Sequence, residues 1–132
     1  RLNLDMLVVD TSAGTGKETL LTMALSDLLF VVLTLDQQEV QGTSVTIDAA
    51  RELSIPHTYG VVNKVTATYA DESVRSQIAI EYGCEVESIL PYADEIAEVA
   101  GGGLFAVEHP THRATAAIAR IQKELIREAY RD

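Results

Sequence analysis

The sequence has one cysteine, Cys84, among its 132 residues. It therefore forms no internal disulfide and holds no C-x-x-C motif. A membrane-spanning helix needs about 18 apolar residues, and the longest apolar run, Leu28 to Leu33, has only the length of a strand. The first residues, RLNLDM, lack the basic start and apolar middle of a signal peptide. These absences predict a protein of the reducing cytoplasm.

Basic residues are also scarce. Ten Lys and Arg stand against twenty Asp and Glu, which gives a formal net charge of −10. This balance argues against a chain that by itself binds nucleic acid through a basic face. Because Asp and Glu stay well hydrated in concentrated salt, the composition suits a halophilic source and an ordinary acidic cytosolic protein equally. The 47% hydrophobic content is ample for the core of a single domain over residues 1–132.

The most informative stretch, LDMLVVDTSAGTGK, runs from Leu4 to Lys17. Its apolar run Met6–Val9 predicts a short buried strand, because a glycine-containing turn follows it directly. Such a strand would deliver Asp10 to the carboxyl edge of a parallel sheet, where α/β proteins bind ligands. Glycines at positions 14 and 16 allow backbone N–H groups to approach an anion closely. The stretch therefore predicts a site for a polyphosphate and a metal ion.

Lys17 does not fit the lysine of a P-loop. The pattern G-x-x-x-x-G-K-[ST], placed on Gly16 and Lys17, requires Gly at position 11 and Ser or Thr at position 18. This chain has Thr11 and Glu18 there. A carboxylate at position 18 would stand where a phosphate-bound Mg²⁺ needs a hydroxyl ligand. We therefore interpret Lys17 as an exposed residue in the first turn of a helix.

The run D-T-S-A-G from Asp10 to Gly14 resembles the second nucleotide motif, D-[ST]-P-A-G, of the MinD/ParA class of deviant P-loop ATPases. The resemblance implies that Asp10 holds Mg²⁺ through water and that the turn at Gly14 senses the γ-phosphate of ATP. The chain departs from the family at Ser12, where Pro is usual, and at Lys17, where one branch has Asp.

Strand and helix patterns alternate downstream of this stretch. The sequence predicts helices at 18–26, 44–54, 70–82, 91–100 and 113–130, and strands at 28–34, 59–65 and 85–90. Strands that alternate with helices indicate parallel βαβ units. The predicted fold class is α/β: a three-layer αβα domain with a mostly parallel sheet, of the P-loop NTPase type. The triple glycine at 101–103 predicts a flexible joint.

Two later segments follow the order of the same family. Asn63 lies in G-V-V-N-K, which resembles the segment G-[LV]-[VI]-x-N-[RK], whose Asn recognises the adenine edge with an amide donor and acceptor. Taken alone, an Asn at a strand end is more often a turn residue. Pro91 and Tyr92 lie in L-P-Y-A-D, which resembles the I-P-x-D segment that wraps the base. The resemblance thus implies that Asn63, Pro91 and Tyr92 contact ATP.

The family's signature loop, K-G-G-x-G-K-[ST], does not occur in the sequence. In the family, this loop precedes the Asp10 motif and carries the lysines that grip the phosphates. The Asp that positions the attacking water belongs to the same half. We therefore expect the chain, which starts at Arg1 without Met, to be the C-terminal half of an ATPase domain, without catalytic residues and inactive alone. The family's strand order also implies open sheet edges, which need the N-terminal half or strands exchanged between copies.

The resemblance implies that ATP and Mg²⁺ are bound and that ATP is hydrolysed as a switch of dimerisation in cell division, partitioning or cargo positioning. The expected partners are ATP, a second copy, an activating protein and, through parts outside this chain, a membrane or the nucleoid. Two alternatives stay open. One is a metal-centre maturation or iron–sulfur scaffold ATPase of the same fold. The other is a non-catalytic regulatory domain of flavodoxin-like topology.

The histidines, at positions 57, 109 and 112, form no obvious metal set, and we interpret them as capping or surface residues. The last predicted helix carries an apolar stripe with helical periodicity, which predicts packing on the sheet rather than on lipid. The stripe consists of Ala114, Ala117, Ile118, Ile121 and Leu125.

Overall fold

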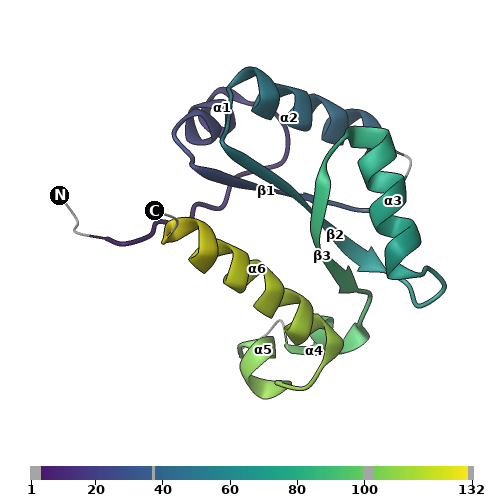
Figure 1. Ribbon diagram of the computed structural model, residues 1–132. Coiled ribbons are helices and arrows are strands. Elements are labelled where there is room, and N and C mark those ends of the chain that lie inside the picture. Colours follow the sequence, from purple (N-terminus) through teal and green to yellow (C-terminus); the bar gives the residue numbers. More distant parts are fainter. Residues whose placement is uncertain (1–3, 37, 100–102, 131–132) are drawn as a thin grey trace.

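The computed structural model describes residues 4–36, 38–99 and 103–130 (Figure 1). Its strands are β1 (Leu28–Leu33), β2 (His57–Val65) and β3 (Glu85–Pro91), which form a parallel sheet in the order β1-β2-β3. The helices are α1 (Lys17–Ala24), α2 (Val40–Glu52), α3 (Asp71–Tyr82), α4 (Asp94–Val99), α5 (Phe105–Glu108) and α6 (Arg113–Ala129).

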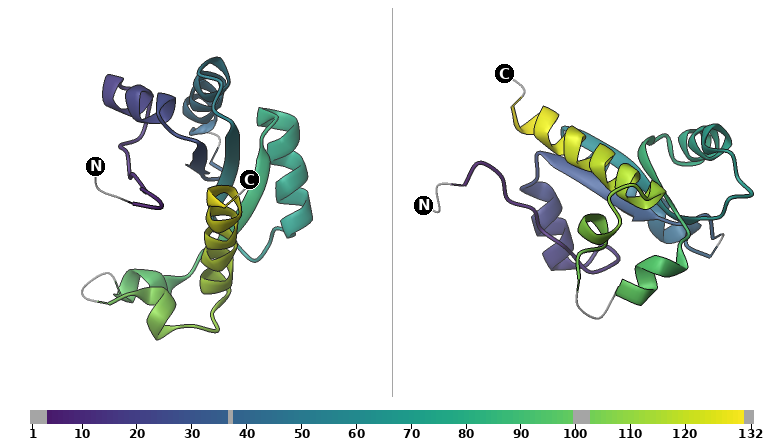
Figure 2. Two further views of the ribbon diagram at one scale, coloured as in Figure 1. Left: turned by 60° about the vertical axis from the view of Figure 1, so that its left-hand side comes forward. Right: turned by 90° about the horizontal axis from the view of Figure 1, so that it is seen from below.

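Helices α2 and α3 cover one face of the sheet and α6 covers the other, which gives an αβα arrangement (Figures 1 and 2). The core lies between the sheet and the α2–α3 layer, where β1, a continuous apolar run, and β2 both supply buried side chains. Its most deeply buried side chains are Leu33, Val62, Val74 and Ile78. The predicted α/β fold class, with strands that alternate with helices, is confirmed.

Most predicted elements are present, with shifted ends. Helix α2 begins at Val40, four residues before its predicted start, and α4 begins at Asp94 because Pro91 still pairs with Val65 in the sheet. The short helix α5 lies between the predicted joint and the last helix, where no element was predicted. The joint predicted at 101–103 lies largely outside the described residues. No helix within the described ranges is both long and apolar enough to cross a membrane.

The predicted strand at Met6–Val9 is wrong for this structure. The segment Leu4–Val9 has no regular secondary structure, and every residue in it is exposed. A strand needs a neighbouring strand to satisfy its backbone N–H and C=O groups. In this structure the segment pairs with none of β1, β2 and β3, which make up the described part of the sheet. The apolar run therefore stays in water, and Asp10 is exposed with it.

A bulge in β3 determines how α6 meets the sheet. Pairing with β2 shifts by one residue at Glu87, and Val86 before the bulge packs in the α2–α3 core. Because of the shift, Ser88 does not share a face with Val86 but lies on the opposite face, toward α6. There the Ser88 hydroxyl donates a 2.7 Å hydrogen bond to the Ala117 carbonyl oxygen in α6. The Glu87 carboxylate is close enough to Glu124 to be affected by its charge.

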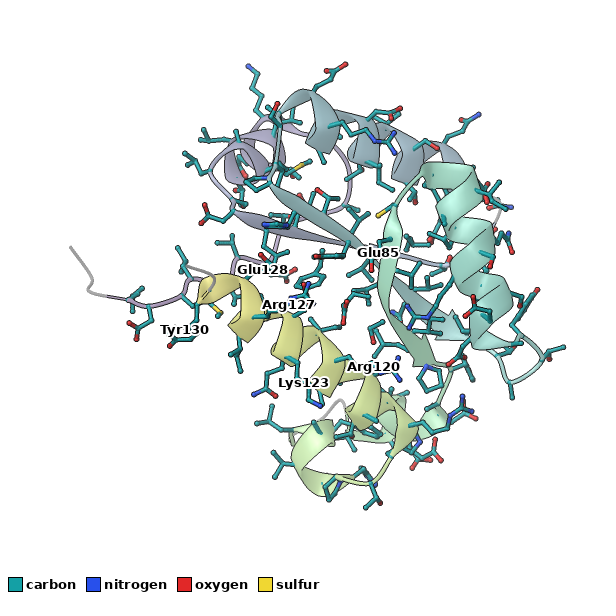
Figure 3. The ribbon with its side chains drawn as sticks, in the orientation of Figure 1. Glu85, Arg120, Lys123, Arg127, Glu128 and Tyr130 are labelled. Carbon is teal, nitrogen blue, oxygen red and sulfur yellow. The ribbon has the colours of Figure 1, made fainter. Side chains whose placement is uncertain are left out.

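The C-terminal half of α6 contacts the sheet through charged side chains (Figure 3). Glu124 is only 4% exposed, and Arg127 donates to it as well as to the Tyr59 hydroxyl at 3.3 Å and to Glu128 at 3.4 Å. The His57 Nε2 lies 3.0 Å from a Glu128 carboxylate oxygen. Burial and the hydrogen bond with Glu124 raise the pKa of Tyr59. These five residues form a polar cluster, called the α6 cluster below.

The structure confirms the capping interpretation for His112. His112 caps α6, because its Nδ1 accepts the Ala114 N–H at 3.1 Å. Cys84 is buried, and burial raises the pKa of its thiol. The thiol is therefore a small packing group rather than a reactive nucleophile.

Candidate functional site

A cleft of about 350 Å³ opens at the carboxyl ends of β1 and β2. This position is where open parallel sheets bind ligands, because neighbouring strand ends and their loops converge there. The lining comes from the segment after β1 and from the end of β2. The residues are Thr34, Leu35, Asp36 and Glu39 on one side and Lys64, Thr66 and Tyr69 on the other.

The wall that follows β1 is held together by its own polar groups. The Thr34 hydroxyl donates to a Glu39 carboxylate oxygen at 2.7 Å and accepts the Asp36 N–H at 3.2 Å. The Asp36 carboxylate accepts the Gln38 N–H at 2.9 Å, as in an Asx turn. These bonds fix two carboxylates, Asp36 and Glu39, at the mouth of the cleft.

The opposite wall begins where β2 departs from regular pairing. The register between β2 and β3 is irregular between Val62 and Val65, and Lys64 has a left-handed φ of 57°. A residue other than glycine pays about 1–3 kcal/mol for such a conformation, and strained residues of this kind cluster at functional sites. The Asn63 side-chain oxygen accepts the Lys64 N–H at 2.9 Å. The turn thereby brings Lys64 into the cleft lining, with Asn63 directly before it.

The end of β3 lies beside this turn. Pro91 pairs with Val65, and the Tyr92 N–H donates to the Val65 carbonyl oxygen at 2.8 Å. The Tyr92 side chain is well exposed, and a hydrogen bond to the Asp94 carboxylate raises the pKa of its phenol. Asn63, Pro91 and Tyr92 therefore lie at the carboxyl ends of two neighbouring strands. That they contact a nucleotide stays a prediction.

Asp10 and Gly14 are not brought to this edge. Both are exposed in the segment before α1, and neither lines the cleft. Gly14 has a φ of 94°, a conformation that glycine adopts without strain. Over residues 4–36, 38–99 and 103–130, no three His, Cys, Asp or Glu side chains gather in a way that could hold a metal ion. The role of Asp10 as an Mg²⁺ ligand through water thus stays a prediction.

Reasoning from the sequence missed the acidic wall and Tyr69. A usable signal existed, since residues that directly follow parallel strands converge at one edge, and Thr34 to Glu39 directly follow β1. Lys64 carried the same signal, because it lies near the end of β2, but its left-handed backbone could not be predicted from the sequence.

Comparisons with known proteins place the fold. No protein-family model matches the chain, and none of the curated proteins matches it in sequence. Among solved structures, it is similar to the MinD cell division protein of Aquifex aeolicus, with a TM-score of 0.64 and 15% identity. The fold is MinD-like. The match covers 79% of this chain and 45% of the MinD chain, so the chain spans less than half of that protein's length.

Proposed function

We propose that this chain binds ATP with Mg²⁺ at the carboxyl edge of its sheet, as part of an ATPase domain with a MinD-like fold. The observation that carries the proposal is the contact between the carboxyl ends of β2 and β3. The 2.8 Å hydrogen bond from the Tyr92 N–H to the Val65 carbonyl oxygen holds Tyr92, which directly follows β3, next to the end of β2. There Asn63 directly precedes Lys64, which lines the cleft. The likeness to MinD supports the fold on which this arrangement rests.

The adenine base would pair with Asn63. Its amide oxygen accepts the Lys64 N–H but has a second lone pair, and the amide nitrogen has two hydrogens to donate. Adenine offers a donor and an acceptor on one edge, which match these groups. Tyr92, 59% exposed at the neighbouring strand end, offers an aromatic face on which the base can stack.

The ribose and phosphates would extend over the cleft. The Lys64 ammonium supplies the positive charge for a phosphate, and the carboxylates of Asp36 and Glu39 can accept hydrogen bonds from ribose hydroxyls. Bound Mg²⁺ would neutralise part of the phosphate charge. We assign Asp10 to the metal through water and Gly14 to the γ-phosphate, which requires the segment before α1 to approach the edge.

Hydrolysis would act as a switch of dimerisation that an activating protein stimulates. Phosphoryl transfer depends on positioned cations around the transferred group. Because the sequence holds no K-G-G-x-G-K-[ST] loop, we expect this chain alone to bind nucleotide weakly and to hydrolyse none.

Weak binding is measured best by a two-dimensional ¹⁵N NMR titration of the 132-residue chain with MgATP, AMP and MgGTP. We expect MgATP and AMP to shift the amide signals of Asn63, Lys64 and Tyr92, and MgGTP to shift them less. Asn63→Ala should abolish the preference for adenine. Gln122→Ala, which removes an exposed amide from α6, is the matched control and should keep it.

Two outcomes would contradict the proposal. Absence of shifts at the β2 and β3 ends with any of the three nucleotides would remove the nucleotide site. Equal shifts with MgATP and MgGTP, unchanged in Asn63→Ala, would leave a phosphate site and exclude adenine recognition by Asn63.

A further inference from the structure

The corner between α5 and α6 is built around two histidine rings. The helices contact each other, and residues 109–112 connect them. The Phe105 ring of α5 stacks on His109 with ring centroids 4.7 Å apart, and it meets His112 edge-on at 5.1 Å. Figures 1 and 2 show α5 beside the start of α6. The corner belongs to no part of the proposed nucleotide site.

Hydrogen bonds tie this corner to the first turn of α6. The Thr115 hydroxyl donates to the His109 carbonyl oxygen at 2.7 Å, and the His112 N–H donates to the same oxygen at 3.1 Å. Neither of these bonds depends on the charge of an imidazole. In contrast, the 3.1 Å bond from the Ala114 N–H needs the lone pair of the His112 Nδ1. Only the neutral ring, with its proton on Nε2, can accept it.

Protonation of His112 acts against the corner in two ways. An imidazolium carries a hydrogen on both nitrogens and accepts no bond, so the Ala114 N–H loses its partner. The positive charge also stands at the N-terminus of α6, where the helix macrodipole is itself positive. Histidine is the side chain that ordinarily changes its charge between about pH 5 and 8. The cap therefore depends on pH in a way that a serine or asparagine cap does not.

No ion pair among the described residues holds the charged form of His112. The connecting segment contributes His109, whose stack on Phe105 suits a charged ring as well as a neutral one. The other charged groups of the elements packed here are Glu108 of α5, Arg113 at the start of α6, and Glu85 and Glu87 of β3. Glu87 is close to Glu124, in the second half of α6.

We propose that His112 makes the α5–α6 corner a pH-sensitive joint. At neutral pH, the uncharged ring caps α6 and lies against Phe105, which keeps α5 on the domain. In weakly acidic solution, the ring takes up a proton, the cap opens and α5 separates from α6. The rest of α6 stays on the sheet, because Ser88 binds it and because protonated His57 forms an ion pair with Glu128. This joint needs no nucleotide and is independent of the function proposed above.

NMR of the 132-residue chain between about pH 8 and about pH 5.5 tests the joint. This range stays above the isoelectric point of about 4.6. The measured quantities are the protection of the Ala114 amide against hydrogen exchange, corrected for the intrinsic effect of pH on exchange, and the nuclear Overhauser contact between the rings of Phe105 and His112. As the pH falls, we expect the protection to decrease about fivefold, as for the loss of one N-cap, and the ring contact to disappear.

Two substitutions of His112 should remove the pH dependence in opposite ways. Asparagine caps helices without titrating, so His112→Asn should keep the Ala114 amide protected over the whole range. His112→Ala has no cap and should leave this amide poorly protected over the whole range. His109→Asn removes the other histidine of the corner and is the matched control, which should keep the pH dependence of the parent.

Three results would overturn the proposal. The first is equal protection of the Ala114 amide at both ends of the pH range in the parent chain. The second is a decrease in protection that persists in His112→Asn or is absent in His109→Asn, because His112 would then not be the group that titrates. The third is a cap that opens while the Phe105 ring keeps its contacts with α6, because α5 would then stay in place.

Discussion

The segment Leu4–Val9 and the C-terminal half of α6 reverse the usual relation between polarity and burial. Leu7 and Val8 are more than 70% exposed, whereas Glu124 is 4% exposed and the Glu128 side chain is 6% exposed. The apolar run thus lies in water, and two carboxylates lie between a helix and a sheet. Both regions depart from what their residue types alone would predict.

The difference teaches that burial depends on available partners. A strand can be buried only if another strand pairs with its backbone, and no strand of the described sheet pairs with Leu4–Val9. A carboxylate can be buried if donors meet it, and Glu124 has the Arg127 guanidinium while Glu128 has Arg127 and His57. Pairing therefore outweighs hydrophobicity in both regions.

The largest expected effect tests this comparison directly. Glu124→Lys replaces a buried carboxylate by a cation beside Arg127, which leaves two positive charges together and removes the acceptor of Arg127. We expect a loss of about 3–5 kcal/mol in the free energy of unfolding. Leu7→Lys introduces a lysine into the exposed segment instead. It should change the free energy of unfolding by less than about 0.5 kcal/mol.

Urea denaturation followed by circular dichroism, at a protein concentration low enough to keep the chain monomeric, measures both variants. If Leu7→Lys destabilised the monomer as much as Glu124→Lys does, Leu4–Val9 would be part of the folded core. The contrast between the two regions would then be false.

Much of the fold could be predicted because strand and helix patterns alternate along the sequence. The segments at 28–34, 59–65 and 85–90 correspond to β1, β2 and β3, and the strand ends fix where Asn63, Pro91 and Tyr92 lie. Only the first of these segments is a continuous apolar run. The run Met6–Val9 has the same pattern and forms no strand. An apolar run shows that a segment can form a buried strand, but the strand forms only where a neighbouring strand pairs with it.

The face of α6 could not be predicted from its periodicity. The apolar stripe correctly includes Ala114 and Ala117, which are buried, but Ile118 is 40% exposed and Glu124 is buried in its place. The reason lies in β3, where the bulge at Glu87 presents polar side chains to α6. A bulge has no clear sequence pattern, so neither the α6 cluster nor its donors could be identified beforehand.

The second prediction concerns the hydrogen bond that this bulge makes possible. The Ser88 side chain is completely buried, and its hydroxyl donates to the Ala117 carbonyl oxygen at 2.7 Å. Ser88→Ala removes this donor and should reduce the free energy of unfolding by about 1–2 kcal/mol. Ser76→Ala, on the exposed side of α3, is the control and should change it by less than about 0.5 kcal/mol. Equal stability of both variants in urea would mean that α6 is held without this bond.

The smallest effect concerns Glu87, at the centre of the bulge. Burial raises the pKa of its carboxyl above the ordinary value of 4.5, and the negative charge of Glu124 raises it further. A raised pKa means that the folded chain binds the proton more tightly than the unfolded chain does. This contribution to stability is present below the ordinary pKa and is lost as the pH rises through the raised value.

The glutamine side chain of Glu87→Gln cannot ionise, so the variant does not lose stability as the pH rises. At neutral pH, the variant should therefore have a higher free energy of unfolding than the parent chain. This gain should be smaller than the loss caused by Ser88→Ala, and it should vanish below the ordinary pKa of Glu87. Urea denaturation midpoints across the acidic to neutral range measure the difference. Glu85→Gln, which removes an exposed carboxylate from the same strand, is the control. If Glu87→Gln were more stable than the parent by the same amount at every pH, the gain would come from hydrogen bonds of the new amide. The proximity of the Glu87 and Glu124 carboxylates would then not destabilise the folded chain.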